Sequence, residues 1–219
     1  MSDTLARYLE PLPLIAVLRG ITPEEIPAVG EALVARGFRI LEVPLNSPRP
    51  FASIRALADR FGEQCLVGAG TVLSVDEVTQ VNAAGGRLVV MPHGETALIR
   101  EAKRQGLVCV PGVATPTEAF AALAAGADGL KMFPAEQMPP SALKAWRAVL
   151  PRDARVFPVG GIRPDSMAPY WAAGADGFGT GSNLYAPGAP VAEVDKSAAA
   201  YAAAFRALPR RPAPGIAPR

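Results

Sequence analysis

The chain has 219 residues, half of them hydrophobic, and its 22 basic and 20 acidic residues leave a formal net charge of +2. This balance lacks the strongly basic character of a nucleic-acid-binding protein, and the apolar runs are too short to span a bilayer. We therefore expect a soluble, cytoplasmic protein with neither nucleic acid nor a membrane as a partner.

Short apolar runs alternate with helix-forming stretches along the chain. Strands are predicted, in chain order, at residues 15–18, 40–43, 66–69, 88–91, 108–110, 129–132, 156–159 and 177–178. Such runs are typical of parallel strands that are buried on both faces. Eight strand–helix units predict an α/β fold, a single-domain (β/α)8 TIM barrel over residues 1–208, rather than an open doubly wound sheet. The Pro- and Arg-rich segment 209–219 is predicted to be a disordered tail.

Glycines mark the expected helix ends. Each follows a helix-forming stretch and precedes a short β-rich segment, as a C-terminal cap does. The glycines are Gly37, Gly62, Gly85, Gly106, Gly126 and Gly174. The sequence Ala-Gly-Ala-Asp-Gly occurs at 125–129 and again at 173–177, so the chain contains a true internal repeat.

The two cysteines, Cys65 and Cys109, lie in apolar segments and lack the paired spacing of a zinc site. We expect them to be reduced core residues. Because His93 is the only histidine, the usual metal sites built from several imidazoles are excluded. The sequence thus predicts a protein without a metal or another cofactor.

Catalytic groups of such a barrel come from the carboxyl ends of the strands. Lys131 stands in an apolar strand there, and a lysine is seldom fully buried unless it is paired or functional. One interpretation is an amine that reaches outward or pairs with a carboxylate. The other is a nucleophile, because removal from water favours the uncharged amine that attacks carbonyl groups.

Glu42 is the matching case, a carboxylate within the apolar run 40–45. On its own it could be a structural partner of Lys131 or Arg19. Together, however, an interior amine and an interior acid/base group are what imine chemistry requires. The pair predicts a Schiff-base enzyme.

Two glycine-rich turns follow the last two predicted strands. Gly160 and Gly161 precede an expected helix, and Gly181 and Ser182 precede a short possible one. Glycines at these positions let backbone N–H groups approach a phosphate, and a helix N-terminus favours its charge. We therefore predict a phosphate site between the two turns.

Six motifs in this order carry a resemblance to a known family: LRGI at 18–21, LEVPLNSP at 41–48, GAGTV at 68–72, PGVATPTE at 111–118, LKMFP at 130–134 and VGG at 159–161. The chain resembles, from about Leu14 to Tyr185, the 2-keto-3-deoxy-6-phosphogluconate (KDPG) and 2-keto-3-deoxy-6-phosphogalactonate (KDPGal) aldolases.

The resemblance implies a homotrimeric class I aldolase barrel in which each site residue has a role. Lys131 would form the Schiff base and Glu42 would be the general acid/base. Arg19 and Thr71 would contact the carboxylate end of pyruvate, and Phe133 would line the site. The phosphate would be held by Gly160, Gly161, Gly181 and Ser182.

Asn46, Ser47 and Val159 resemble the galactonate branch of the family, whose gluconate branch tends to have threonines in two of these places. The expected reaction is cleavage of 2-dehydro-3-deoxy-6-phosphogalactonate to pyruvate and D-glyceraldehyde 3-phosphate, within galactonate degradation. The C4 epimer, the phosphogluconate derivative, or 4-hydroxy-2-oxoglutarate is the alternative substrate. His93 departs from both branches, and we expect it in a loop at the mouth of the site.

Three other functions remain open on the residues alone. A metal-dependent class II aldolase would need several metal ligands, which one histidine does not favour. A non-catalytic phosphosugar-binding barrel would keep the glycine turns without needing Lys131. A phosphosugar isomerase on the same barrel would have no use for an interior lysine nucleophile.

Overall fold

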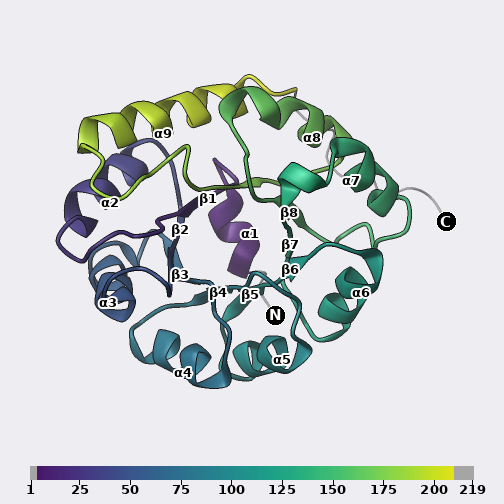
Figure 1. The fold of residues 1–219 in the computed structure, drawn as a ribbon, viewed down its shortest axis with the longest axis horizontal. Coiled ribbons are helices and arrows are strands. Elements are labelled where there is room, and N and C mark those ends of the chain that lie inside the picture. The colour runs from purple at the N-terminus through teal and green to yellow at the C-terminus, as the bar shows by residue number, and fades with distance from the viewer. Residues whose placement is uncertain (1–3, 210–219) are drawn as a thin grey trace.

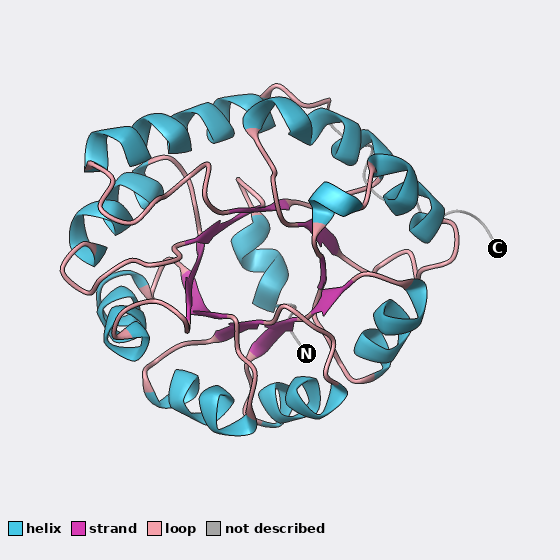
Figure 2. Cartoon of the chain, in the orientation of Figure 1, coloured by secondary structure: helices cyan, strands magenta, loops and turns pink. Residues whose placement is uncertain are grey.

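The computed structural model describes residues 4–209, and its strands lie around a ring with most helices outside it (Figure 2). Within these residues the strands are β1 (Leu14–Val17), β2 (Ile40–Pro44), β3 (Leu66–Gly70), β4 (Leu88–Val90), β5 (Val108–Val110), β6 (Gly112–Val113), β7 (Leu130–Met132), β8 (Val156–Pro158) and β9 (Phe178–Thr180). Figure 1 shows that β1 to β8 follow one another around the ring in chain order. Each of the eight predicted strands overlaps one of these.

All paired strands are parallel, and they form two sheets. One sheet has the order β5-β4-β3-β2-β1-β9 and the other the order β6-β7-β8. At one junction the chain runs from β5 through Pro111 into β6. At the other, Val159 and Gly179 form an isolated parallel bridge, and the N–H of Asp176 donates to the carbonyl oxygen of Val156 at 2.8 Å.

The predicted parallel α/β fold is confirmed, but the strands do not form one continuous closed sheet. Prolines explain the breaks, because a proline has no N–H to donate to a neighbouring strand. Pro111 separates β5 from β6, and Pro158 ends β8 next to β9. The fifth predicted strand is β5, which pairs with β4, and the chain continues past Pro111 into β6, which the sequence did not predict and which pairs with β7.

The helices outside the ring connect successive strands, except the last helix, which follows β9 (Figure 1). They are α2 (Ile26–Ala35), α3 (Pro50–Phe61), α4 (Val75–Ala83), α5 (Thr96–Arg104), α6 (Pro116–Ala124), α7 (Pro140–Arg147), α8 (Met167–Ala173) and α9 (Val191–Arg206), with 3-10 turns η1 (Ala135–Gln137) and η2 (Pro164–Ser166). Five of the six predicted capping glycines have left-handed φ angles between 76° and 114°. Gly62 is the exception, because α3 ends with this residue at a right-handed φ of −61°.

Two clusters of buried side chains pack on opposite faces of the strands. The inner cluster includes Ile15, Ile40, Leu66 and Phe157, whereas Leu14 and Ala16 belong to the outer cluster beneath the helices. This alternation follows from the two-residue period of a strand. Helix α1 (Thr4–Leu9) lies across the ring in Figure 1, and its residues Leu5 and Tyr8 join the inner cluster.

The internal repeat forms the same contact twice. Asp128 accepts hydrogen bonds from the backbone N–H of Cys109 at 2.8 Å and from Lys103 at 2.6 Å. In the second copy, Asp176 accepts from the backbone N–H of Val156 at 2.8 Å and from the guanidinium of Arg147. Each aspartate therefore ties the start of one strand segment to the preceding strand and to a helix outside the ring.

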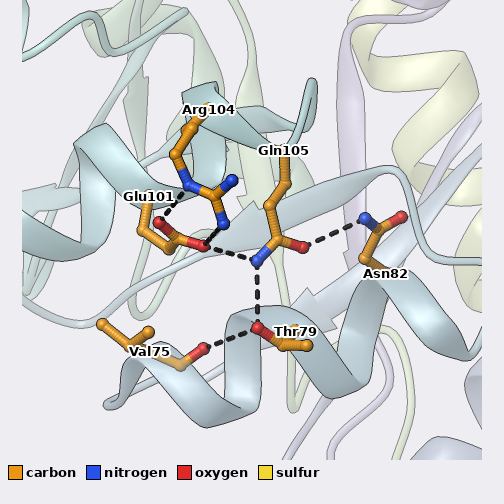
Figure 3. A network of polar contacts seen from close by, with 6 residues as sticks. All are labelled: Val75, Thr79, Asn82, Glu101, Arg104 and Gln105. Carbon is orange, nitrogen blue, oxygen red and sulfur yellow. Dashed lines mark hydrogen bonds and ion pairs between the residues drawn. The ribbon is translucent and has the colours of Figure 1, made fainter.

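A polar network joins α4 to α5 on the outside of the molecule (Figure 3). The amide of Gln105 donates to Thr79 at 3.0 Å and to Glu101 at 2.7 Å, and it accepts from Asn82 at 3.0 Å. Hydrogen bonds from Arg104 and then from Gln105 lower the pKa of Glu101 to about 2. This network fixes the two helices relative to each other.

The remaining sequence predictions concern the C-terminal tail, the domain boundary, the two cysteines and membrane-spanning segments. The predicted tail lies outside the described residues except for Pro209, whose carbonyl oxygen accepts from Trp171 at 2.9 Å. The domain boundary at residue 208 stays a prediction. Cys65 and Cys109 are buried and free, as expected. In the described part of the chain, no helix combines the length and the apolar character needed to cross a membrane.

Candidate active site

Lys131 lies inside the ring of strands. Its neighbours on β7, Leu130 and Met132, belong to the outer cluster, so the alternation of side chains directs Lys131 inward. Only 6% of the residue is exposed. Its amine lies 4.5 Å from the centre of the Phe133 ring. The lysine is thus largely removed from water, which is the condition that the nucleophile interpretation needs.

Glu42 faces the same interior from β2. Leu41 and Val43 belong to the outer cluster and Ile40 to the inner one, which places the carboxylate inside the ring. The residue is 1% exposed, and its Oε2 atom accepts no hydrogen bond from any described residue. A buried carboxylate oxygen without a partner is costly, and such groups concentrate at functional sites.

Burial shifts the pKa values of this pair in opposite directions. It raises the pKa of Glu42 to about 7, although the positive charges of Lys131 and Arg19 oppose the shift. It lowers the pKa of Lys131, a shift that Glu42 opposes and Arg19 reinforces. The amine therefore loses its proton more readily than an exposed lysine, and the carboxyl group can take up or release a proton near neutral pH.

A cavity of about 400 Å³ opens at Lys131, a size suited to a small molecule. Its wall comes from the loops that follow β1, β7, β8 and β9, at the carboxyl ends of these strands. The lining residues are Val17, Arg19, Gly20, Lys131, Phe133, Glu136, Val159, Gly160, Gly161, Ile162, Gly181, Ser182, Asn183, Tyr185, Ala186 and Pro187. Most of the predicted site residues thus meet around one space.

A second cavity, of about 420 Å³, lies elsewhere and does not compete with this assignment. Asp128, Asp153 and Arg155 contribute to its lining, and these residues stand before β7 and β8. It therefore lies at the amino ends of the strands, where barrel enzymes do not place their chemistry.

Asn46 and Ser47 act on the cavity through the loop that follows β1. The guanidinium of Arg19 donates to the side-chain oxygen of Asn46 at 2.7 Å, and the N–H of Gly20 donates to the hydroxyl of Ser47 at 2.9 Å. Neither Asn46 nor Ser47 lines the cavity itself. Of the three predicted specificity residues, only Val159 does, next to the glycine pair.

The two glycine turns lie side by side on the cavity wall. Gly160 and Gly161 have φ angles of 108° and 63°, which favour glycine over any other residue. Gly181 and Ser182 belong to the same lining, where Gly181 lies beside Val17. The predicted helix after Ser182 is wrong: the backbone makes a single turn there, closed by the N–H of Leu184 on the carbonyl oxygen of Gly181 at 2.7 Å.

Besides Asn46 and Ser47, three further predicted residues do not line the cavity: Glu42, Thr71 and His93. Thr71 follows β3 directly, in a left-handed conformation with φ of 56°, and is half-buried. His93 is exposed in the loop between β4 and α5. Among the described residues no group of three His, Cys, Asp or Glu side chains could hold a metal ion.

Sequence reasoning missed several lining residues, and Glu136 is the most informative. It belongs to η1, four residues beyond the end of β7, so a rule that inspects only strand ends overlooks it. A methyl group added at Gly160 or Gly161 would meet the Glu136 side chain, so this carboxylate lies against the glycine pair. The hydroxyl of Tyr170, shared between the carbonyl oxygens of Ala135 at 2.9 Å and Met138 at 3.0 Å, anchors both ends of the turn.

Comparison with known proteins connects this site to a family. The family model described as KDPG and KHG aldolase matches residues 5–197. The chain is 50% identical over 196 residues to a protein of Rhizobium meliloti (strain 1021) named "Probable 2-dehydro-3-deoxy-6-phosphogalactonate aldolase". The aligned region covers 90% of this chain and 92% of that protein. The chain is also 46% identical over 195 residues to the 2-dehydro-3-deoxy-6-phosphogalactonate aldolase of Escherichia coli (strain K12). That aligned region covers 89% of this chain and 95% of the Escherichia coli protein.

A solved structure supports the same relationship. The structure described as native KDPGal superimposes with a TM-score of 0.89 at 45% sequence identity, covering 91% of this chain and 97% of that one. The chain belongs to the KDPG and KHG aldolase family.

Proposed function

We propose that the protein is a class I, Schiff-base aldolase, a carbon–carbon lyase that cleaves 2-dehydro-3-deoxy-6-phosphogalactonate to pyruvate and D-glyceraldehyde 3-phosphate. One observation carries the proposal: a buried lysine and a buried carboxylate are electrostatically coupled inside the ring, and the lysine opens onto a cavity of about 400 Å³. The names of the relatives point to the same substrate.

The mechanism begins with the amine of Lys131. The neutral amine adds to the C2 ketone to give a carbinolamine, and loss of water gives a protonated imine. Glu42 supplies and removes the protons of these steps. It then takes the proton of the C4 hydroxyl while the C3–C4 bond breaks and its electron pair moves into the imine. The resulting enamine is protonated at C3, and hydrolysis releases pyruvate and the free lysine.

The remaining residues hold the substrate on either side of Lys131. Arg19 would pair with the carboxylate of the keto acid, because it is a fixed cation in the cavity wall. Phe133 would shield the imine from water. At the other side, backbone groups of Gly160, Gly161 and Gly181 and the hydroxyl of Ser182 would surround the phosphate. Thr71 would contribute to the carboxylate end from the half-buried position beside Gly70.

The galactonate configuration at C4 is the finer part of the proposal. It rests on Asn46, Ser47 and Val159, of which Val159 lines the cavity and the other two fix the loop of Arg19 and Gly20. A side-by-side assay of the two C4 epimers and of 4-hydroxy-2-oxoglutarate tests it. We expect the highest kcat/KM for the phosphogalactonate derivative. A strong preference for the phosphogluconate epimer would overturn the choice of branch.

We propose further that the two sheets together form a (β/α)8 barrel. The backbone continuity at Pro111 and the bridge between Val159 and Gly179 support closure of the ring. We also propose a cytoplasmic homotrimer that acts in galactonate degradation. The family resemblance supports the trimer, as do exposed apolar side chains at Leu73 and Phe120 that a partner could cover.

Pyruvate release by the purified protein separates the aldolase from its rivals. We expect turnover by the wild type, full activity in excess EDTA, and no turnover by Lys131→Met, which keeps an apolar side chain of similar length. Loss of activity with EDTA would favour a class II aldolase. Wild-type binding of the sugar acid without pyruvate release would favour a non-catalytic binding protein, and isomerisation without cleavage would favour an isomerase.

A further inference from the structure

Gly70 is the last residue of β3, and its backbone does not require glycine. It is absent from the residues with left-handed φ angles, whereas the next residue, Thr71, adopts one without being glycine. Gly70 is also buried. The reason for a glycine here must therefore be space rather than conformation.

The space at Gly70 is filled by one side chain. A methyl group built on Gly70 would overlap the carboxylate of Glu42, and its three nearest atoms are Oε2, Cδ and Oε1 of that residue. Gly68, two residues earlier on the same strand, differs: a methyl group there would meet the backbone carbonyl of Leu88. The two glycines of β3 therefore make room for different neighbours.

We propose that Gly70 is a positioning residue for catalysis, because its missing side chain forms the slot in which the carboxylate of Glu42 is held. This inference rests on the proposed function, in which Glu42 is the acid/base. No described residue donates a hydrogen bond to Oε2 of Glu42, so packing rather than hydrogen bonding fixes that oxygen. A small shift of such a group is enough to lower the rate of proton transfer.

The first test is Gly70→Ala. The added methyl group should displace the carboxylate and lower kcat on the order of 10- to 100-fold, with KM for the sugar acid nearly unchanged. The pH at which kcat reaches half its maximum should also move, because the carboxylate enters a different environment. The amine of Lys131 remains, so borohydride with pyruvate should still trap an adduct. Wild-type kcat and an unchanged pH profile would overturn the inference.

The second test uses rescue by a shorter carboxylate. Glu42→Asp withdraws the carboxylate by one methylene group, which leaves room for a methyl group on residue 70. Adding Gly70→Ala in the Glu42→Asp background should therefore cost less than about threefold in kcat, against the larger loss in the wild-type background. Equal losses in both backgrounds would show that the methyl group acts elsewhere. If Gly70→Ala alone does not fold, the inference requires that the double variant Gly70→Ala, Glu42→Asp does fold. A double variant that also fails to fold would overturn the inference.

Gly68→Ala is the matched control. It makes the same substitution on the same strand, but its methyl group meets the Leu88 carbonyl. We expect a lower melting temperature that Glu42→Asp does not restore, and rescue of this variant would contradict the proposed slot. The proposed function has its own failure mode: if Glu42→Gln keeps wild-type turnover, Glu42 is not the acid/base. If Glu42→Gln is inactive and Gly70→Ala is fully active, only the role of Gly70 fails.

Discussion

Burial raises the pKa of Glu42, which suits the residue to proton transfer but lowers the stability of the folded chain when the carboxylate is charged. Because its pKa in the folded chain is about 7 rather than the ordinary 4.5, the folded state binds its proton more tightly than the unfolded state. The stability that the protonated form contributes is fully present below about pH 4.5 and is lost as the pH rises through about 7. The protein thus keeps a buried acid/base at the expense of stability in alkaline solution.

Glu42→Gln should therefore stabilise the chain at pH 8. A neutral amide removes the buried charge, and a pKa shift of this size corresponds to a free energy on the order of 3 kcal/mol, or a rise of several degrees in melting temperature. At pH 4.5 the difference should vanish. Thermal denaturation at both pH values checks this, and the same variant should lose turnover.

Glu101→Gln is a control, because the pKa of Glu101 is shifted in the direction opposite to that of Glu42. Hydrogen bonds from Arg104 and Gln105 lower the pKa of Glu101 to about 2, so its contribution is present above pH 4.5 and is lost as the pH falls through 2. Glu101→Gln should not raise the melting temperature at pH 8. A similar rise in both variants would mean that burial of charge is not the cause.

Glu136 places a negative charge beside the proposed phosphate turns, where Gly160 and Gly161 offer only backbone groups. The carboxylate of Glu136 and a phosphate bound at these turns would both be negatively charged and would repel each other. Glu136→Gln should therefore lower KM for the phosphorylated sugar acid by about threefold to tenfold and leave kcat within twofold. Steady-state kinetics measure both. A higher KM would indicate instead that the carboxylate accepts a hydrogen bond from a substrate hydroxyl.

At the scale of elements, the repeated Ala-Gly-Ala-Asp-Gly sequence acts as a clamp between strands. Asp176→Asn and Asp128→Asn each replace a carboxylate that accepts from a backbone N–H and a cation. We expect each to lower the free energy of unfolding by about 1–3 kcal/mol, with KM unchanged because neither residue lines the main cavity. Denaturant titration measures the loss. An unaltered midpoint in both variants would contradict the clamp.

Elements defined by local sequence could be predicted, and those defined by contacts between loops could not. Continuous apolar runs located every described strand except the two-residue β6, because the outer and inner faces of a buried strand both favour apolar residues. The division into two sheets depends on Pro111 and Pro158, whose missing N–H groups matter only once the neighbouring strands are known. The helix expected after Ser182 is a turn, because local composition does not distinguish one turn from a helix.

The site shows the same limit. Lys131 and Glu42 stand out in the sequence because charged residues interrupt apolar strands, and the alternation of each strand then directs them inward. Glu136 gave no such signal, because its place in the cavity depends on how η1 lies against the glycines after β8. The effect of Asn46 and Ser47 on the loop after β1 likewise appears only in three dimensions.

On the scale of the whole molecule, the ring concentrates its polar chemistry at one end. The inner cluster of Ile15, Ile40, Leu66 and Phe157 fills the ring, and α1 packs Leu5 onto it. Lys131 opens onto the cavity at the carboxyl ends of the strands, and Glu42 lies buried in the interior of the ring. The apolar filling thus supplies the low-dielectric surroundings that shift both pKa values.

Trapping of the imine tests the central claim most directly. Wild-type protein treated with pyruvate and borohydride should gain the mass of one reduced pyruvate per chain, and peptide mapping should place it on Lys131. Lys144→Met, which removes an exposed lysine, should give the same adduct, and Lys131→Met should give none. An unchanged intact mass of the wild type, or an adduct on another lysine, would contradict the account.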